Sequence, residues 1–129
     1  MTDINNLVIE GRLTTDITDR DFMYLQNGTA KMTIHIATNR SRKNGEEWVE
    51  ETSFFDIVVW GKYAESLRTK LYKGCHIFAV GRLQQDRWID QNGQKKSRVC
   101  IVSDQIQTES KGNNNNGYNN GYDNYSDFN

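Results

Sequence analysis

The 129-residue sequence contains no proline, so no rigid hinge divides the chain. It also lacks any run of 18 apolar residues, about the length that a membrane-spanning helix needs. Its first residues, 1–6, carry neither a basic start nor a long apolar stretch, so we expect no secretory signal and a cytoplasmic location. The length suits one domain with a single hydrophobic core.

Cysteine and histidine are scarce, with two residues of each. In the cytoplasm thiols stay reduced, so Cys75 and Cys100 are expected to be buried free thiols rather than a disulfide. The cysteines and the histidines, His35 and His76, do not follow the spacing of zinc ligands. We therefore expect neither a metal site nor a cofactor.

Net charge is nearly absent, because 16 Lys and Arg oppose 17 Asp and Glu. This balance argues against a protein that holds nucleic acid by bulk charge alone, but it allows local basic clusters. Two clusters are present. One is Arg40, Arg42 and Lys43 in a predicted hairpin tip, and the other is Arg82, Arg87, Lys95, Lys96 and Arg98 against Asp86 and Asp90.

The sequence is rich in the alternation that is typical of strands. Strands are predicted over residues 7–13, 29–38, 48–60, 75–83 and 99–106, with a further short one over 22–25. The only helical pattern covers residues 61–71, with Ala64, Leu67 and Leu71 on one apolar stripe and Gly74 as terminator. A turn signal at residues 92–93 makes the last two strands a long two-stranded finger.

Residues 48–60 hold three large aromatic side chains on one face. Trp48, Phe54 and Trp60 share this face of the predicted strand, whereas the opposite face becomes apolar toward its end. Exposed rings spaced along a strand form a stacking platform for nucleobases. Buried core rings are the alternative, and alternation alone does not decide between them. Trp88 lies on the polar finger with only Ile89 as an apolar neighbour, which favours contact with a ligand.

The first strand and its neighbour carry three further signals. Residues 7–9 are apolar on both faces, which indicates burial on both sides or pairing with another copy. Gly11 within the same strand indicates a bulge or a bend. His35 lies on the polar face of the strand over 29–38, beside Lys31 and Thr33, and is expected to be an ordinary surface side chain.

From residue 111 the composition changes to Asn, Gly and Tyr without any aliphatic side chain, so no core can form there. We predict a folded domain over residues 1–110 and a disordered tail over residues 111–129. An inert solvating tail is the simplest interpretation. Gly-Tyr repeats that self-associate or contact bases weakly are the alternative.

Five strands with one helix between the third and the fourth are the plan of the oligonucleotide-binding (OB) barrel, an all-β fold. Residues 4 to about 107 resemble a bacterial single-stranded DNA-binding protein of the homotetrameric type. The stretches that carry the resemblance follow one another across the whole domain: residues 7–13, 27–30, 58–65, 73–74, 81–83, and Trp88 with residues 90–93.

The resemblance implies a binding protein, not an enzyme, that protects single-stranded DNA in replication, recombination and repair at a bacterial nucleoid. Bases are expected to stack on Phe54, Trp60 and Trp88. Phosphate contacts are expected from Arg40, Arg42, Lys43, Lys62, Arg82, Arg87, Lys95, Lys96 and Arg98. A homotetramer is expected to assemble through Leu7, Val8 and Ile9, and through Phe55, His76 and Phe78.

The chain departs from the family pattern in four places. Arg42 stands where members often have another stacking tryptophan, and its guanidinium is expected to stack on a base or pair with a phosphate. Asp56 replaces a commonly positive residue, so it is expected to weaken binding slightly or to be offset by a nearby Lys or Arg. Trp48 matches no stacking position. The end lacks the acidic run and Pro-Phe that recruit replication and repair proteins, so recruitment is expected to involve Asp127 and Phe128.

Three other functions stay open on the residues alone. A protein–protein adaptor on the same barrel would account for the divergent hairpin tip and Asp56. An RNA binder would use the same rings, because stacking does not distinguish ribose from deoxyribose. A nuclease would need clustered carboxylates with a metal, or a paired acid and base. The acids here are scattered, and those around the hairpin at 46–51 have no histidine near in sequence.

Overall fold

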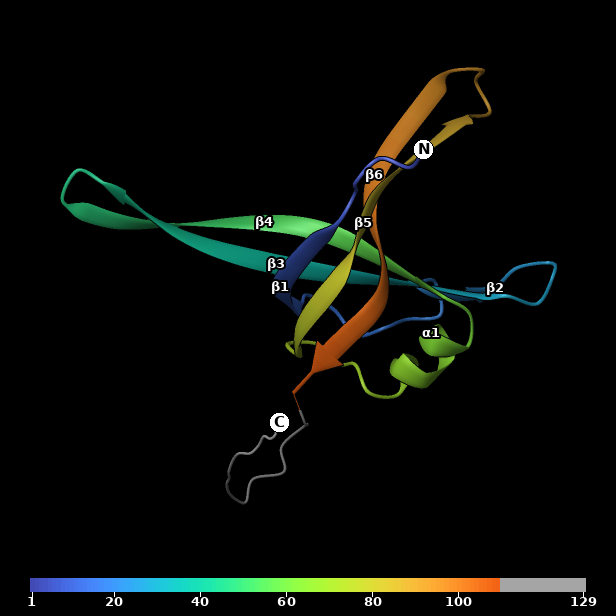
Figure 1. The fold of residues 1–129 in the computed structure, drawn as a ribbon, viewed down its shortest axis with the longest axis horizontal. Helices are drawn as coiled ribbons and strands as arrows, with labels where there is room; N and C mark the ends of the chain where they lie inside the picture. Colours follow the sequence, from blue (N-terminus) through green and yellow to red (C-terminus); the bar gives the residue numbers. More distant parts are fainter. Residues whose placement is uncertain (110–129) are drawn as a thin grey trace.

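The computed structural model describes residues 1–109, which form a closed barrel with two long ribbons (Figure 1). Its elements are β1 (Leu7–Leu13), β2 (Phe22–Tyr24), β3 (Ala30–Asn44), β4 (Glu47–Trp60), α1 (Gly61–Arg68), β5 (His76–Ile89) and β6 (Lys95–Thr108). The long strands follow the order β1-β5-β6-β4-β3, and pairing of β1 with β3 closes the ring. The predicted five-stranded all-β barrel is confirmed, with α1 between its third and fourth long strands.

The core fills the inside of this ring because the long strands alternate. Every second residue of β3 from Ala30 to Ile36 is buried, and Ile57 and Val59 of β4 face them from the neighbouring strand. Cys75 and Cys100 are buried free thiols, as predicted. The interior is therefore mainly aliphatic, with Phe22 of β2 as the buried ring of the described core, and the large rings of β4 and β5 lie outside it.

The helix α1 is shorter than the periodicity predicts. It ends at Arg68, with Thr69 as its C-cap, whereas the prediction extended to Leu71. Leu71 is still buried, because the chain turns after the helix and carries this side chain back to the core. Gly74 does not terminate α1 but lies in the turn before β5. Among the described residues, no helix has the length and apolar character needed to cross a membrane.

Two glycines mark places where strands approach too closely for a side chain. At Gly11 a Cβ atom would lie 2.7 Å from the carbonyl oxygen of Ala37, so this glycine marks the crossing of β1 over β3. The irregular register lies elsewhere, between Val80 and Gly81 of β5, where a Cβ would collide with the backbone of Val102. The bulge or bend expected at Gly11 is thus a close approach, and the bulge itself is at Gly81.

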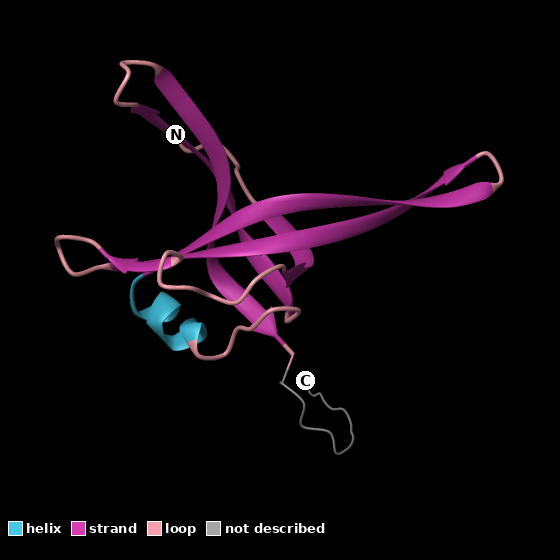
Figure 2. Cartoon of the chain, turned by 180° about the vertical axis from the view of Figure 1, so that it is seen from behind, coloured by secondary structure: helices cyan, strands magenta, loops and turns pink. Residues whose placement is uncertain are grey.

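Two antiparallel ribbons extend beyond the barrel, as Figures 1 and 2 show. The β3–β4 ribbon is paired from Lys31 and Trp60 out to residues 44 and 47. The β5–β6 finger is paired out to residues 89 and 95, and its turn is held by hydrogen bonds between Asp90 and the backbone of residues 92–94. The predicted long hairpin and finger are both confirmed.

Candidate nucleic-acid interface

The rings that the sequence singled out are exposed, which decides between the core and the surface interpretations. Phe54 is 71% exposed, Trp60 38% and Trp88 46%. Trp48, near the tip of the β3–β4 ribbon, is 70% exposed. Exposed aromatic side chains at these positions are available to stack with flat ligands.

The ring-bearing residues of β4 share one face of the β3–β4 ribbon. Residues that pair directly across two strands point to the same side of a sheet. Trp60 is paired with Lys31, Phe54 with Ala37, and Trp48 with Lys43. One side of this twisted ribbon therefore carries three rings in a row, with a lysine opposite the first and the last.

The same face continues onto the finger through the parallel contact between β4 and β6. Ile57 pairs with Ile101 inside the barrel, and Val58 pairs with Val102 on the outside. Counting outward along the finger from Val102 in steps of two leads to Lys96, which is paired with Trp88. The ring of Trp88 thus belongs to the face that carries Phe54 and Trp60, although it comes from the other ribbon.

The predicted phosphate-binding residues divide between the two faces of the sheet. Strand register places Lys43, Arg82, Lys96 and Arg98 on the face of the rings, whereas Arg40, Arg42, Arg87 and Lys95 start from the opposite face. Lys62 is exposed on the first turn of α1, two residues after Trp60. Near the end of the finger the division is less strict, because a hollow of about 420 Å³ is lined by Arg87, Trp88, Ile89, Lys95, Lys96 and Ser97.

Arg42 faces away from the rings. It pairs with Val49 on the opposite side of the ribbon, and its Nε donates a hydrogen bond of 2.7 Å to Glu51. Its charge is therefore partly compensated within the ribbon. The side chain that stands where the resemblance expects a further stacking tryptophan is not brought together with Phe54 and Trp60.

Lys31 is a cation of this face that the sequence analysis did not assign to the site. Its Nζ lies 5.5 Å from the centre of the Trp60 ring, close enough for a cation–π contact. The charge of Lys31 is also felt at Cys100 of β6. Burial and Asp86 raise the pKa of the Cys100 thiol, and the positive charges of Arg98 and Lys31 oppose that increase. The signal was present in the sequence, because Lys31 lies on the predicted polar face of its strand.

Asp56, the acid between Phe54 and Trp60, is compensated by a histidine and not by the expected Lys or Arg. His35 Nδ1 lies 2.7 Å from Asp56 Oδ1, and His35 Nε2 lies 3.0 Å from Asp21 Oδ1. Two ionised carboxylates accept only, so this geometry suits a protonated ring that donates from both nitrogens. His35 is on the predicted polar face, but it bridges two acids instead of standing alone.

The protonation of this cluster follows from its contacts. Burial alone would lower the pKa of His35, but the hydrogen bonds and charges of Asp56 and Asp21 outweigh it and raise that pKa. Burial would likewise raise the pKa of Asp21, and hydrogen bonds from Thr18 and His35 lower it instead. The His35 ring and the Asp21 carboxylate thus favour each other's charged form.

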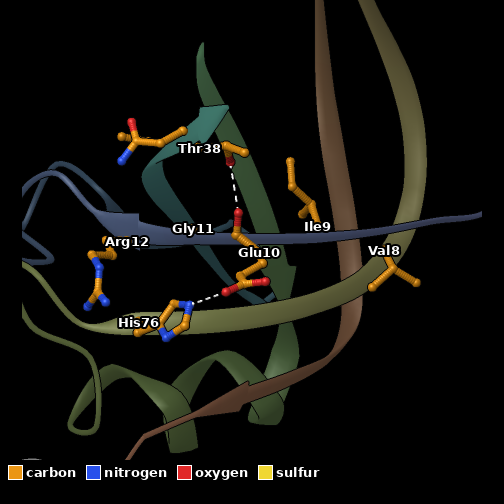
Figure 3. Close-up of a pocket in the computed structure, with 9 residues that line it drawn as sticks. Val8, Ile9, Glu10, Gly11, Arg12, Thr38 and His76 are labelled. Carbon is orange, nitrogen blue, oxygen red and sulfur yellow. Dashed lines mark hydrogen bonds and ion pairs between the residues drawn. The ribbon is translucent and has the colours of Figure 1, made fainter. Parts of the chain in front are cut away.

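A second surface is formed along β1, the strand expected to join subunits. β1 pairs with β5 over Leu7–Arg12 but with β3 only at Arg12 and Leu13. Within residues 1–109 the other edge of residues 7–11 has no ladder partner, and a groove of about 420 Å³ lies between it and residues 37–39 (Figure 3). Val8 is 75% exposed, so this strand is not buried on both sides.

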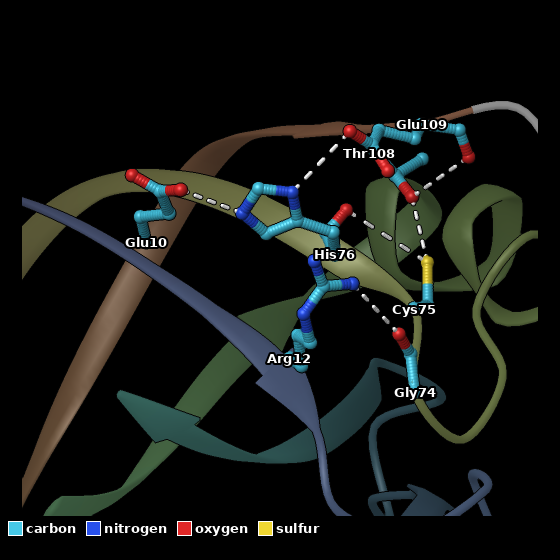
Figure 4. A network of polar contacts seen from close by, with 7 residues as sticks. All are labelled: Glu10, Arg12, Gly74, Cys75, His76, Thr108 and Glu109. Atoms are coloured by element: carbon cyan, nitrogen blue, oxygen red, sulfur yellow. Dashed lines mark hydrogen bonds and ion pairs between the residues drawn. The ribbon is translucent and has the colours of Figure 1, made fainter. Parts of the chain in front are cut away.

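His76 lies beside this groove and is largely covered by its own chain. Its Nε2 is 2.7 Å from Glu10 and its Nδ1 is 3.3 Å from Glu109 (Figure 4). The centre of its ring is 4.7 Å from that of Phe78. Phe78 and Phe55 are both exposed. Of the three residues Phe55, His76 and Phe78 expected to join subunits, two are therefore exposed apolar rings and the third is a hydrogen-bonded histidine.

Residues 4–108 match the sequence model of the Single-strand binding protein family. The chain belongs to this family. The single-stranded DNA-binding proteins of Treponema pallidum and Borreliella burgdorferi are 42% and 41% identical to it over 107 and 115 residues. The alignments cover 83% and 88% of this chain, but 58% and 75% of the two relatives.

Two solved structures have a similar fold. A deletion mutant of the single-stranded DNA binding protein from Thermus aquaticus has a TM-score of 0.72 at 26% identity, covering 84% of this chain and 51% of that one. A Plasmodium falciparum SSB in complex with ssDNA has a TM-score of 0.73 at 24% identity, covering 85% and 98%. At 24% identity, the likeness to the Plasmodium falciparum structure concerns the fold alone.

For this member of the Single-strand binding protein family, the predicted tail stays a prediction. Residues 111–129 lie outside the described part of the chain, and with them Asp127 and Phe128, the two residues expected to recruit partners.

The histidine bridge predicts a pH-dependent contribution to stability. A group whose pKa is raised by folding stabilises fully below its unfolded value and loses that contribution as pH rises through its folded value. His35→Gln should therefore lower the melting temperature most near about pH 5.5, below the unfolded pKa of about 6.5, and least near about pH 9. Thermal unfolding of both proteins across this range measures it. A pH-independent difference would contradict the bridge.

Proposed function

We propose that this protein binds single-stranded DNA without sequence preference and protects it during replication, recombination and repair. The observation that carries the proposal is the single sheet face on which Phe54, Trp60 and Trp88 are exposed together with lysines and arginines. Membership of the Single-strand binding protein family supports it. With DNA as ligand and bacterial relatives, the site of action is the cytoplasm, at the nucleoid.

The proposed mechanism is stacking assisted by phosphate contacts. Each base that stacks on an aromatic side chain contributes roughly 1–3 kcal/mol, and any base has a flat face to offer. Bases in a duplex already stack on one another, so the exposed rings select unpaired strands. The cations beside the rings hold phosphates, and the His35 bridge reduces the repulsion that Asp56 would otherwise exert.

Removal of the rings tests this mechanism. Trp60→Ala and Trp88→Ala should each weaken binding to oligo-dT by roughly 1–3 kcal/mol, the contribution of one stacked base. Fluorescence anisotropy of a labelled oligonucleotide measures the affinity, with oligo-rU and duplex DNA as competitors.

The outcomes separate the alternatives. Unchanged affinity in both variants would contradict the stacking assignment, and preference for oligo-rU would indicate an RNA binder. A wild-type protein without affinity for any strand would leave the adaptor function.

Lys31 offers a test of the charged part of the face. Lys31→Ala should weaken binding and reduce the slope of log K against log salt concentration by about 0.7, the value for one phosphate contact on a single strand. Lys70→Ala, an exposed lysine just beyond α1, serves as the matched control and should leave both quantities unchanged. Equal effects of the two substitutions would show that bulk charge, not position, matters.

We propose further that four chains assemble through the β1 edge and the exposed apolar side chains of that surface. The edge of residues 7–11 can accept a strand from a second copy, since within residues 1–109 it has no ladder partner and only the Glu10 carbonyl is bonded, by the Thr38 hydroxyl. Val8, Phe55 and Phe78 supply the exposed apolar area that an interface buries. Recruitment of replication and repair proteins through Asp127 and Phe128 is the remaining part of the proposal.

A charge on the apolar surface tests the assembly. Phe78→Glu should convert a four-chain particle to a smaller one, because the interface would bury an unpaired carboxylate. Ser66→Glu places the same charge on the exposed side of α1 and should leave the mass unchanged. Light scattering coupled to size exclusion gives the mass, and a folded four-chain Phe78→Glu particle would contradict the proposed surface.

A further inference from the structure

Trp48 has no role in the resemblance to the family, yet its side chain is among the most exposed apolar groups of the described chain. It lies near the tip of the β3–β4 ribbon, where it is paired with Lys43. Within residues 1–109, no aromatic pair and no cation–π contact involves it. The indole therefore contributes little to packing in the folded chain.

The position of Trp48 relative to the other rings is regular. Trp48, Phe54 and Trp60 follow one another at intervals of six residues on the same face of β4, which corresponds to about 20 Å between neighbours along the strand. A single exposed apolar side chain is common on protein surfaces. Trp48 differs from such an isolated side chain because it continues a row of exposed rings on the proposed binding face. A nucleic-acid strand that follows the ribbon past Trp60 and Phe54 would reach Trp48 next.

The charges around Trp48 suit a polyanion on this side. Lys43 lies directly opposite Trp48 on the same face of the ribbon. The next residue of β4 on this face is the acid Glu50, which is paired with Ser41. On the reverse face, Glu51 is occupied by Arg42 through a hydrogen bond of 2.7 Å. The acids of the tip are thus partly compensated on the side away from the rings, and the ring side keeps its lysine free of a short ion pair with any described residue.

We propose that Trp48 is an additional stacking position for an unpaired nucleobase, at the outer end of the face formed by Trp60 and Phe54. It supplies at this hairpin the ring that Arg42, on the reverse face, does not supply. The inference rests on the proposed function and extends it: the strand is held along the whole β3–β4 ribbon. Oligonucleotides too short to reach the tip do not contact Trp48.

The intrinsic fluorescence of Trp48 tests this directly. In the double variant Trp60→Phe and Trp88→Phe, Trp48 is the only tryptophan, and the phenylalanines keep the other stacking rings. Titration with oligo-dT of about 4 to about 16 nucleotides, the range of site sizes for one OB barrel, should quench the emission only at the longer lengths. Binding followed in parallel by anisotropy of a labelled oligonucleotide shows that the variant still holds the strand.

Affinity gives the second readout. Trp48→Ala should weaken binding of the longest oligonucleotide roughly 5- to 150-fold, the factor for one stacked base, and leave the shortest unchanged. Trp48→Phe should retain most of the affinity because it keeps a ring. Arg42→Ala, the matched substitution on the reverse face, should have a smaller effect than Trp48→Ala.

The results distinguish this inference from the proposed function. If Trp60→Ala and Trp88→Ala weaken binding while Trp48→Ala does not, and Trp48 emission is unquenched, Trp48 is not a stacking position and the DNA-binding function stands. If the wild-type protein binds no oligonucleotide, the function itself fails. An equal loss at every oligonucleotide length would also overturn the inference, since it would indicate a structural role for Trp48.

Discussion

The parallel contact between β4 and β6 determines the shape of the proposed binding face. Two residue pairs, Ile57 with Ile101 and Val58 with Val102, make this contact. The first pair points into the barrel and the second outward, so the hydrophobic interior fixes which side of each ribbon is outside. A shift of one residue in this register would turn Trp88 to the reverse side of the sheet. The same strand register therefore determines both which side chains pack in the core and which side of the sheet carries the rings.

A chain with a formal charge of −1 presents a cationic face only by sorting its charges. Strand register places Lys31, Lys43 and Lys96 beside the rings, and sends Arg40 and Arg42 to the reverse side. Sorting also explains why an acid is tolerated between Phe54 and Trp60. The carboxylate of Asp56 is bound to His35, which also binds Asp21, so it is directed into a local bridge instead of toward a phosphate.

Local patterns predicted the barrel and the two hairpins, because alternation and turn residues act over a few positions. They placed Trp48, Phe54 and Trp60 on one face but left open whether that face is exposed. They did not predict which cations share a side, since this depends on pairings between strands far apart in sequence. The partners of His35 show the same limit: Asp56 lies on another strand and Asp21 precedes a short one. The end of α1 was misplaced because Leu71 continues the apolar spacing through a turn.

The β4–β6 contact also bears on how the chain folds. Residues 57–58 must wait for residues 101–102, which belong to the last strand of the barrel to leave the ribosome, so the ring cannot close during synthesis of its first four long strands. Pairing over such a separation costs loop-closure entropy before it gains any burial, so we expect closure of the ring to limit the folding rate. With no proline in the chain, isomerisation about X–Pro bonds adds no slow phase that would mask it.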